Sequence, residues 1–224
     1  GVQFLTGQMI TDMEYFKKHT WRANPQAFNA YVLSMAKKPA KKSMDLLYSQ
    51  RDYLSVYGKS LLCLAYFNAG NRDRAETLLQ NILQYMEEDD ENETAWLKTS
   101  RSCWWYWYNS DIESNALLIK ALTRLRPKSK LTPRLVKWLL NNRRNGYYWR
   151  STRDTAVCVS AMSDFIRATG ENKPDYTLNI QWDGGISKKV KINKDNFFTF
   201  DNRFVLAGDA LTGGKHKLKL ARDG

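Results

Sequence analysis

The chain has 224 residues, of which 43% are hydrophobic and eight are tryptophan, enough for one or two packed domains. This composition excludes a disordered tail, and no apolar run reaches the ~20 residues of a membrane-spanning helix. The net charge of +12 suits an anionic partner such as nucleic acid. However, Lys and Arg are scattered among segments such as 37–42, 143–144 and 188–194, so a solvated basic surface is the simpler interpretation.

The first part of the chain is predicted to consist of helices. The spacing of apolar residues and the start and stop signals predict helices over about 4–19, 26–37, 43–49, 55–70 and 71–87. Ser55 is a suitable N-cap for the fourth of these helices, which is apolar along most of its length. A shorter, more amphipathic helix follows it. This alternation is typical of helical hairpins in which one helix is buried and its neighbour covers it.

The middle of the chain breaks this pattern before it resumes. The acidic run 87–93 predicts an exposed helix end and a loop. Aromatic residues then dominate, with five in succession at Trp104–Tyr108. Such a block can plug the mouth of a helical ring or form a platform for a ligand, and its role stays open. Ser110 and Glu113 next form a capping box that predicts a helix to about residue 122.

Two further helices are predicted after residue 122. Thr132 as N-cap and Pro133 at the first helical position predict a helix to about Asn142. The strongest signal in the chain is the segment 151–170, which opens with Ser151 as a cap and stops at Gly170. Small and apolar residues lie on more than one face of this segment. We therefore expect a helix that is enclosed by others, equivalent to the earlier apolar helices.

Past Gly170 the periodicity becomes that of strands. Residues 176–182 and 188–192 alternate between apolar and polar, and Asp183-Gly184-Gly185 between them is a hairpin signal. Further short strands are predicted at 197–200, 203–206 and 215–220. We therefore expect a mainly α protein with two parts: a partial α/α toroid of helical hairpins over 1–172, and a small antiparallel β segment over 173–224.

The cysteine and histidine residues point to no metal or cofactor site. Cys63, Cys103 and Cys158 have neither metal-ligand spacing nor a Cys-x-x-Cys pair. Cys63 and Cys158 fall within predicted inner helices, so we expect small buried hydrophobic side chains, and whether they pair stays open. His19 ends a predicted helix, where its ring favours the negative end of the helix dipole. No cofactor is expected.

Several segments resemble a known family. Residues 108–122, 135–139 and 148–156 closely resemble the later part of the thioester domain of alpha-2-macroglobulins and complement components, and residues 47–62 resemble its bacterial branch. The resemblance runs from about Trp21 to Asp183. It implies a toroid of six αα-hairpins, with inner and outer helices alternating, and the start of a following β domain from Pro174 onward.

The reactive motif of this family is missing from the sequence. The family's reactive centre is a Cys and a Gln in a Cys-Gly-Glu-Gln-like motif, joined as a thioester, and no such motif occurs in this sequence. We therefore assign no catalytic residue. The resemblance implies a scaffold fragment of an endopeptidase inhibitor in the periplasm or outside the cell, which meets proteases through its full-length parent and contacts other domains of that parent.

Two alternatives remain open from the sequence. An α/α-toroid enzyme of glycoside hydrolase or cyclase type would use carboxylates near helix starts, namely Asp52, Asp111, Glu113 and Asp154. It would need two of them facing each other across a cleft at ~5–10 Å, whereas capping accounts for Glu113 and Asp154 without catalysis. A basic solenoid that binds nucleic acid would interleave aromatic and basic residues, but the block 104–108 contains no basic residue. No nucleic-acid partner is therefore expected.

Overall fold

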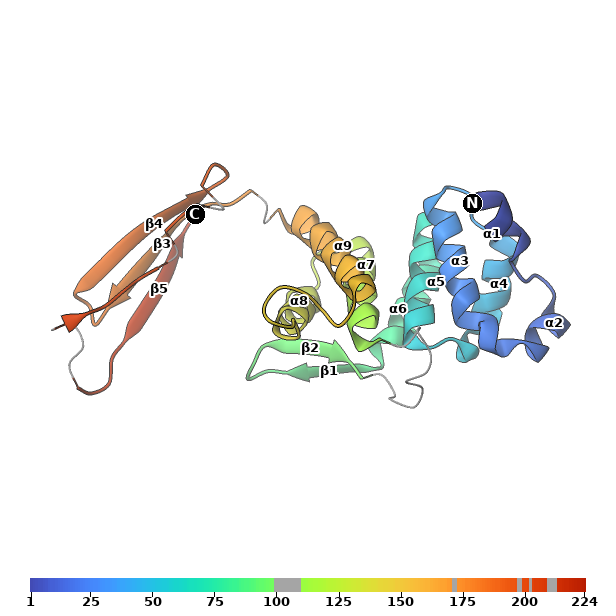
Figure 1. Cartoon of the computed structure of the whole chain (residues 1–224), viewed down its shortest axis with the longest axis horizontal. Helices are drawn as coiled ribbons and strands as arrows, with labels where there is room; N and C mark the ends of the chain where they lie inside the picture. Colours follow the sequence, from blue (N-terminus) through green and yellow to red (C-terminus); the bar gives the residue numbers. More distant parts are fainter. Residues whose placement is uncertain (99–109, 171–172, 197–198, 202, 209–212) are drawn as a thin grey trace. The chain divides into compact units, whose positions relative to one another are not determined.

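The computed structural model describes residues 1–98, 110–170, 173–196, 199–201, 203–208 and 213–224. These residues form two compact units, Gly1–Ala168 and Thr169–Gly224. The first unit is built from helices and one small hairpin, and the second from strands (Figure 1). The mainly α fold class predicted from the sequence is confirmed.

The helical unit contains nine α-helices and a two-stranded sheet within its described residues. Two short 3-10 helices, Thr20–Arg22 and Arg51–Tyr53, connect some of them. The α-helices and strands are α1 (Val2–Gly7), α2 (Met13–Lys18), α3 (Ala23–Met35), α4 (Lys41–Ser49), α5 (Val56–Asn68), α6 (Arg72–Leu83), β1 (Met86–Asp89), β2 (Thr94–Leu97), α7 (Asp111–Leu125), α8 (Leu131–Asn141) and α9 (Thr152–Thr169).

Inner and outer helices alternate along this unit. The helix α5 is central, because eleven of its thirteen residues are buried. It packs against α3 and α7, while α4 packs on α3, α6 on α5 and α8 on α7. The pairs α3–α4, α5–α6 and α7–α8 are therefore helical hairpins, as the alternation of apolar and amphipathic helices predicted. One apolar core runs through the whole unit, from Ile10 to Phe165.

Close packing of α3 on α5 depends on one glycine. A Cβ atom at Gly58 would stand only 2.1 Å from the side-chain oxygen of Asn24. That oxygen accepts hydrogen bonds from the backbone N and the hydroxyl of Ser55, both at 3.1 Å. The start of α5 is thus held against the first turn of α3. The helix predicted over about 26–37 begins earlier, at Ala23, so Asn24 lies in the first turn of α3 and its side chain bonds the start of α5.

Three helix starts agree with the caps predicted from the sequence. The hydroxyl oxygens of Ser55, Ser110 and Ser151 accept hydrogen bonds from the backbone N–H groups three residues later, at 3.3, 3.4 and 3.0 Å. The cap predicted at Thr132 is wrong, because α8 begins at Leu131 with Lys130 before it. Thr132 instead lies buried in the first turn.

The single helix predicted over residues 4–19 is wrong. The chain leaves the helix after Gly7, and Asp12 starts a second one by accepting a hydrogen bond from the backbone N of Tyr15 at 2.7 Å. The buried side chain of Gln26 stabilises the non-helical segment between α1 and α2. Its oxygen accepts from the backbone N of Ile10 and its nitrogen donates to the carbonyl of Gln8, both at 2.8 Å. A long-range contact therefore outweighs the local helical spacing.

The acidic run forms a hairpin rather than a helix end and a loop. The strands β1 and β2 pair in antiparallel fashion, with Met86 opposite Leu97 and Asp89 opposite Thr94. The outer helix α8 packs on β2, and Arg134 of α8 donates to the carbonyl of Asp89 at 2.9 Å and pairs with Asp90 at 2.6 Å. Cations on α8 thus offset the acidic charge that suggested a solvated loop.

The last helix of the unit is less enclosed than predicted. Within the described residues α9 buries Asp154, Cys158, Ala161 and Phe165, which lie along one stripe of the helix. The side of α9 that carries Val159 is open, and Val159 is 57% exposed. The prediction that this helix is enclosed by others on every side is therefore wrong.

The second unit is a three-stranded antiparallel sheet in the order β4-β3-β5. Its strands are β3 (Asp175–Trp182), β4 (Ile186–Asn193) and β5 (Leu218–Asp223). The turn predicted at 183–185 joins β3 to β4 and brings Trp182 opposite Ile186. The further strand predicted at 203–206 is not formed, 199–200 lies outside any strand, and 197–198 lies outside the described residues. The final strand begins three residues later than expected, where it pairs with β3.

Candidate functional site

The starts of three inner helices are joined by a group of polar side chains, which we call the helix-start cluster: Tyr57 on α5, Ser110 and Glu113 on α7 and its cap, and Arg153 and Asp154 on α9. The guanidinium of Arg153 donates to both carboxylate oxygens of Glu113, with Nε to Oε1 at 2.6 Å. It also reaches the hydroxyl of Tyr57 at 3.3 Å. The cluster therefore ties α9 to both α7 and α5.

A second contact doubles the link between α7 and α9. The hydroxyl of Ser110 donates to Asp154 Oδ1 at 2.8 Å while its oxygen caps α7. Farther along the two helices, Lys120 donates to Ser160 at 2.8 Å and to Asp164 at 2.7 Å. Polar contacts thus run along much of the interface between α7 and α9, so their register is fixed by specific hydrogen bonds.

Burial governs the electrostatics of the helix-start cluster. The side chain of Glu113 is 3% exposed, and this burial raises its pKa although the nearby Arg153 acts in the opposite direction. The negative charge of Asp154 raises it further. For Arg153, burial lowers the pKa, but pairing with Glu113 outweighs it and the pKa lies above its ordinary value. The cluster is a half-buried ion pair backed by a second carboxylate.

The structure brings together two of the four carboxylates that an enzyme would use. Glu113 and Asp154 belong to the same cluster, but Arg153 binds the carboxylate of Glu113 and Ser110 donates to that of Asp154. Neither carboxylate lines the pocket that lies between the starts of α5 and α7 and the hairpin β1–β2. Asp111 lies on that pocket, while Asp52 is exposed in a 3-10 turn and does not line it. Of these four carboxylates, Asp111 is the one among the described residues that lines this pocket.

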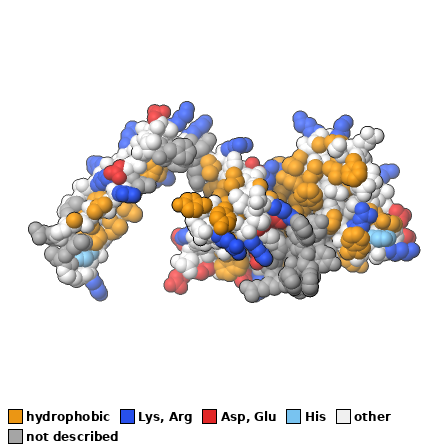
Figure 2. Space-filling view, viewed as in Figure 1, with side chains coloured by type: hydrophobic (Ala, Val, Ile, Leu, Met, Phe, Trp, Pro, Cys, Tyr) orange, Lys and Arg blue, Asp and Glu red, His pale blue; other side chains and the backbone are white. Residues whose placement is uncertain are grey.

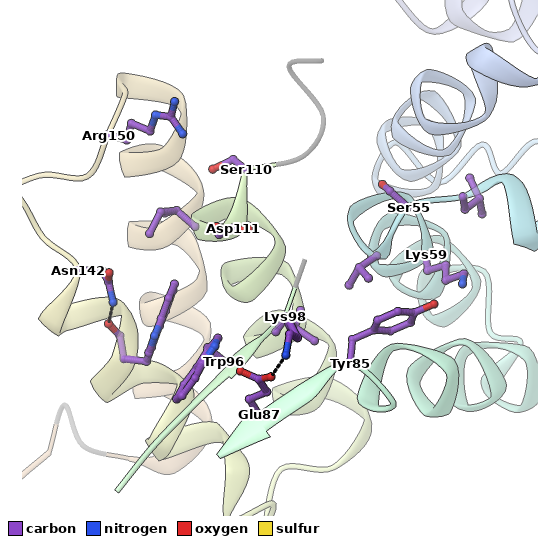
Figure 3. A pocket seen from close by; sticks show the side chains of 15 residues that line it. Ser55, Lys59, Tyr85, Glu87, Trp96, Lys98, Ser110, Asp111, Asn142 and Arg150 are labelled. Atoms are coloured by element: carbon purple, nitrogen blue, oxygen red, sulfur yellow. Dashed lines mark hydrogen bonds and ion pairs between the residues drawn. The ribbon is translucent and has the colours of Figure 1, made fainter. Parts of the chain in front are cut away.

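A pocket of about 930 Å³ opens beside the cluster, and we call it the helix-start pocket (Figure 3). It lies between the starts of α5 and α7 and the hairpin β1–β2. Its polar lining includes Glu87, which pairs with Lys98 at 2.6 Å. The described residues that line it are Leu54, Ser55, Val56, Lys59, Tyr85, Glu87, Trp96, Leu97, Lys98, Ser110, Asp111, Ile112, Trp138, Asn142 and Arg150.

Sequence reasoning missed several of these residues. Lys59 could have been noticed as a cation inside an otherwise apolar helix, and Arg153 as a cation in the first turn of another. Tyr85 and Trp138 carried no such signal, because the pocket is assembled from segments far apart in the chain. The aromatic block Trp104–Tyr108 lies outside the described residues, as does Cys103.

The remaining candidate residues have structural surroundings. Cys63 and Cys158 are free and buried, and burial raises the pKa of each thiol to about 12. The thiol of Cys63 lies 3.2 Å from the carbonyl of Ala75. His19 ends α2, where its Nδ1 lies 2.7 Å from the carbonyl of Tyr15 and its ring stacks on that residue's ring. Among the described residues, no three His, Cys, Asp or Glu side chains gather as a metal site would require.

The basic side chains are spread over the surface, and some of them are paired with acidic residues. On the face shown in Figure 2, Lys and Arg side chains are dispersed rather than gathered into a stripe. Several are paired with acidic residues of neighbouring elements, as Arg134 is with Asp90 and Lys137 with Glu93 at 3.4 Å. On this face the described cations form no continuous track for a phosphate backbone. None of the helices in the described part of the chain is long and apolar enough to cross a membrane.

A comparison with known protein families identifies the helical unit. The family described as the A-macroglobulin TED domain matches residues 25–165, which is more than half of the chain. The matched range runs from the first turn of α3 into α9 and includes every member of the helix-start cluster. The match confirms the resemblance drawn from the sequence.

Proposed function

Because this chain belongs to the A-macroglobulin TED-domain family, we propose that it is a scaffold part of an alpha-2-macroglobulin-like endopeptidase inhibitor of the bacterial type. In such an inhibitor, cleavage of a bait segment elsewhere in the parent triggers a change of shape that encloses the protease. The observation that carries the proposal is the family match over residues 25–165. We assign the chain a packing role and no chemistry.

Two features support a role without chemistry. The sequence contains no Cys-Gly-Glu-Gln-like motif, so these residues cannot form the family's internal thioester. The carboxylates Glu113 and Asp154 are held by Arg153 and Ser110, as expected of groups that fix helices relative to one another. We therefore assign the helix-start cluster to stabilising the toroid.

The domain organisation and location follow the same proposal. We assign residues 1–172 to the later part of the toroid and 173–224 to the start of the β domain that follows it. The partners would be proteases, met through the full-length parent, and other domains of that parent. The compartment would be the periplasm or the extracellular space, where such an inhibitor meets foreign proteases.

The proposal can be tested with the protein expressed from its whole coding sequence. An enclosed protease still admits small peptides but no longer reaches large proteins. Trypsin mixed with the inhibitor should therefore keep hydrolysing a small chromogenic peptide while losing its activity on a large protein substrate. Equal inhibition of both substrates, or of neither, would contradict the trap. The 224-residue chain alone should inhibit neither and serves as the control.

A further inference from the structure

The helix-start pocket contains a buried cation without an anionic partner. Lys59 lies in the buried run of α5 and is 9% exposed. Its ammonium group has no hydrogen-bond acceptor and no ion pair among the described residues. Its described contact is with the ring of Tyr85, whose centroid is 5.6 Å away, and Figure 3 shows the two side chains next to each other on the α5 side of the pocket.

A second buried lysine of the helical unit differs from Lys59 in its partners. Lys120 on α7 is 6% exposed, and its ammonium donates to Ser160 at 2.8 Å and to Asp164 at 2.7 Å. A buried charge is costly unless it is paired, and a cation–π contact offsets only part of that cost. Lys120 meets this requirement within the protein, whereas Lys59 does not. An anion that enters the pocket would supply what Lys59 lacks.

The rest of the pocket favours an organic anion. Ser55 and Ser110 mark the starts of α5 and α7 on its wall, where the positive ends of two helix dipoles favour negative charge. Leu54, Val56 and Tyr85 provide apolar surface near the start of α5, while Arg150 and Trp96 lie on the opposite side of the pocket (Figure 3). The volume of about 930 Å³ lies within the range of about 300–1,000 Å³ that is usual for small-molecule sites.

The acidic residues of the pocket do not cancel this preference. Glu87 is paired with Lys98 at 2.6 Å, and Asp111 is engaged in an interaction of its own. We propose that the helix-start pocket binds a small aromatic carboxylate, with its carboxylate group on Lys59 and its ring against the apolar lining on the α5 side of the pocket, next to Tyr85. This inference goes beyond the scaffold role and does not depend on protease trapping.

The probe for this site is 2-naphthoate, with neutral 2-naphthamide as its uncharged counterpart. Both are titrated into the 224-residue chain by isothermal titration calorimetry at low salt. We expect 2-naphthoate to bind and 2-naphthamide to bind at least about tenfold more weakly, because the amide cannot form a charge-assisted hydrogen bond with Lys59. Absence of naphthoate binding, or equal binding of the two compounds, would overturn the proposal.

Substitutions then locate the binding. Lys59→Met should weaken 2-naphthoate binding by about tenfold to a hundredfold, whereas Lys59→Arg should retain most of it. Lys42→Met, which removes an exposed cation from α4 away from the pocket, is the matched control and should leave binding unchanged. The melting temperature of Lys59→Met should not fall, since methionine removes an unpaired buried charge. Unchanged binding in Lys59→Met, or an equal loss in Lys42→Met, would refute the assignment.

Discussion

Replacing Arg153 by methionine probes the helix-start cluster directly. The variant removes the guanidinium that holds both oxygens of Glu113. Breaking a fully buried ion pair costs about 3–5 kcal/mol, because one charge is left buried and alone. The Glu113 side chain is 3% exposed but that of Arg153 is 39% exposed, so water already screens part of the attraction. We therefore expect the free energy of unfolding to fall by about 2–3 kcal/mol at pH 8.

The loss should depend on pH. The pKa of Glu113 is raised in the folded protein by burial, so the folded state binds the proton more tightly than the unfolded state. Its favourable contribution is complete below the ordinary pKa of 4.5 and is lost as the pH rises through the folded value. The charge and the hydrogen bonds of Arg153 lower the pKa of Glu113, so the pKa of Glu113 should rise further in the variant. A protonated Glu113 needs no cation, so Arg153→Met should cost less at pH 5 than at pH 8.

Urea denaturation followed by circular dichroism at 222 nm measures both effects. The matched control is Arg150→Met, three residues earlier. The guanidinium of Arg150 has no ion pair among the described residues, so its loss should change the free energy of unfolding by less than about 0.5 kcal/mol. Adding Glu113→Gln to Arg153→Met should restore part of the stability at pH 8, since no buried charge remains. The reasoning fails if Arg153→Met costs the same at both pH values or no more than Arg150→Met.

Three further predictions concern the helical unit. Ala161→Trp should destabilise it by about 1–3 kcal/mol or more by overpacking the core, whereas Val159→Trp on the open side of α9 should be tolerated. Thermal melting of both variants compares the two faces of α9. Equal melting temperatures would mean that the buried face is wrongly assigned. Burial raises the pKa of the Cys63 and Cys158 thiols to about 12, so both should resist iodoacetamide at pH 8 in the folded protein and react in urea. Peptide mapping by mass spectrometry detects the modification. Rapid labelling without urea would contradict their burial. Ser110→Ala should cost about 1–2 kcal/mol, since it removes both a cap and the donor to Asp154; an unchanged urea midpoint would show that neither bond contributes.

Local signals in the sequence predicted the helices well. Ser55, Ser110 and Ser151 act as caps because a serine oxygen needs only the N–H group three residues ahead. The alternation of apolar and amphipathic segments predicted the helical hairpins for a similar reason, since helical periodicity reports directly on which face is covered. These features depend on neighbours in sequence.

Features that depend on distant contacts were not predictable in the same way. The break between α1 and α2 is held by Gln26, which lies 16 residues beyond Ile10. The hairpin β1–β2 is matched by cations on α8, and no pattern within the acidic run indicates that partner. The helix-start pocket is likewise lined by residues that lie far apart in the chain, such as Lys59 and Trp138. In the helix-start cluster the serine caps were expected, but the carboxylates of Glu113 and Asp154 bind Arg153 and Ser110, which required the fold.

The coding sequence immediately upstream of the codon for Gly1 tests the central claim most directly. If the chain is the later part of a toroid in a larger inhibitor, translation in the same frame should continue into further helical hairpins of the same kind. A Cys-x-Glu-Gln motif within them would make methylamine sensitivity of the whole protein the next measurement. A start codon followed directly by the codon for Gly1, or by a signal peptide that ends there, would contradict the account.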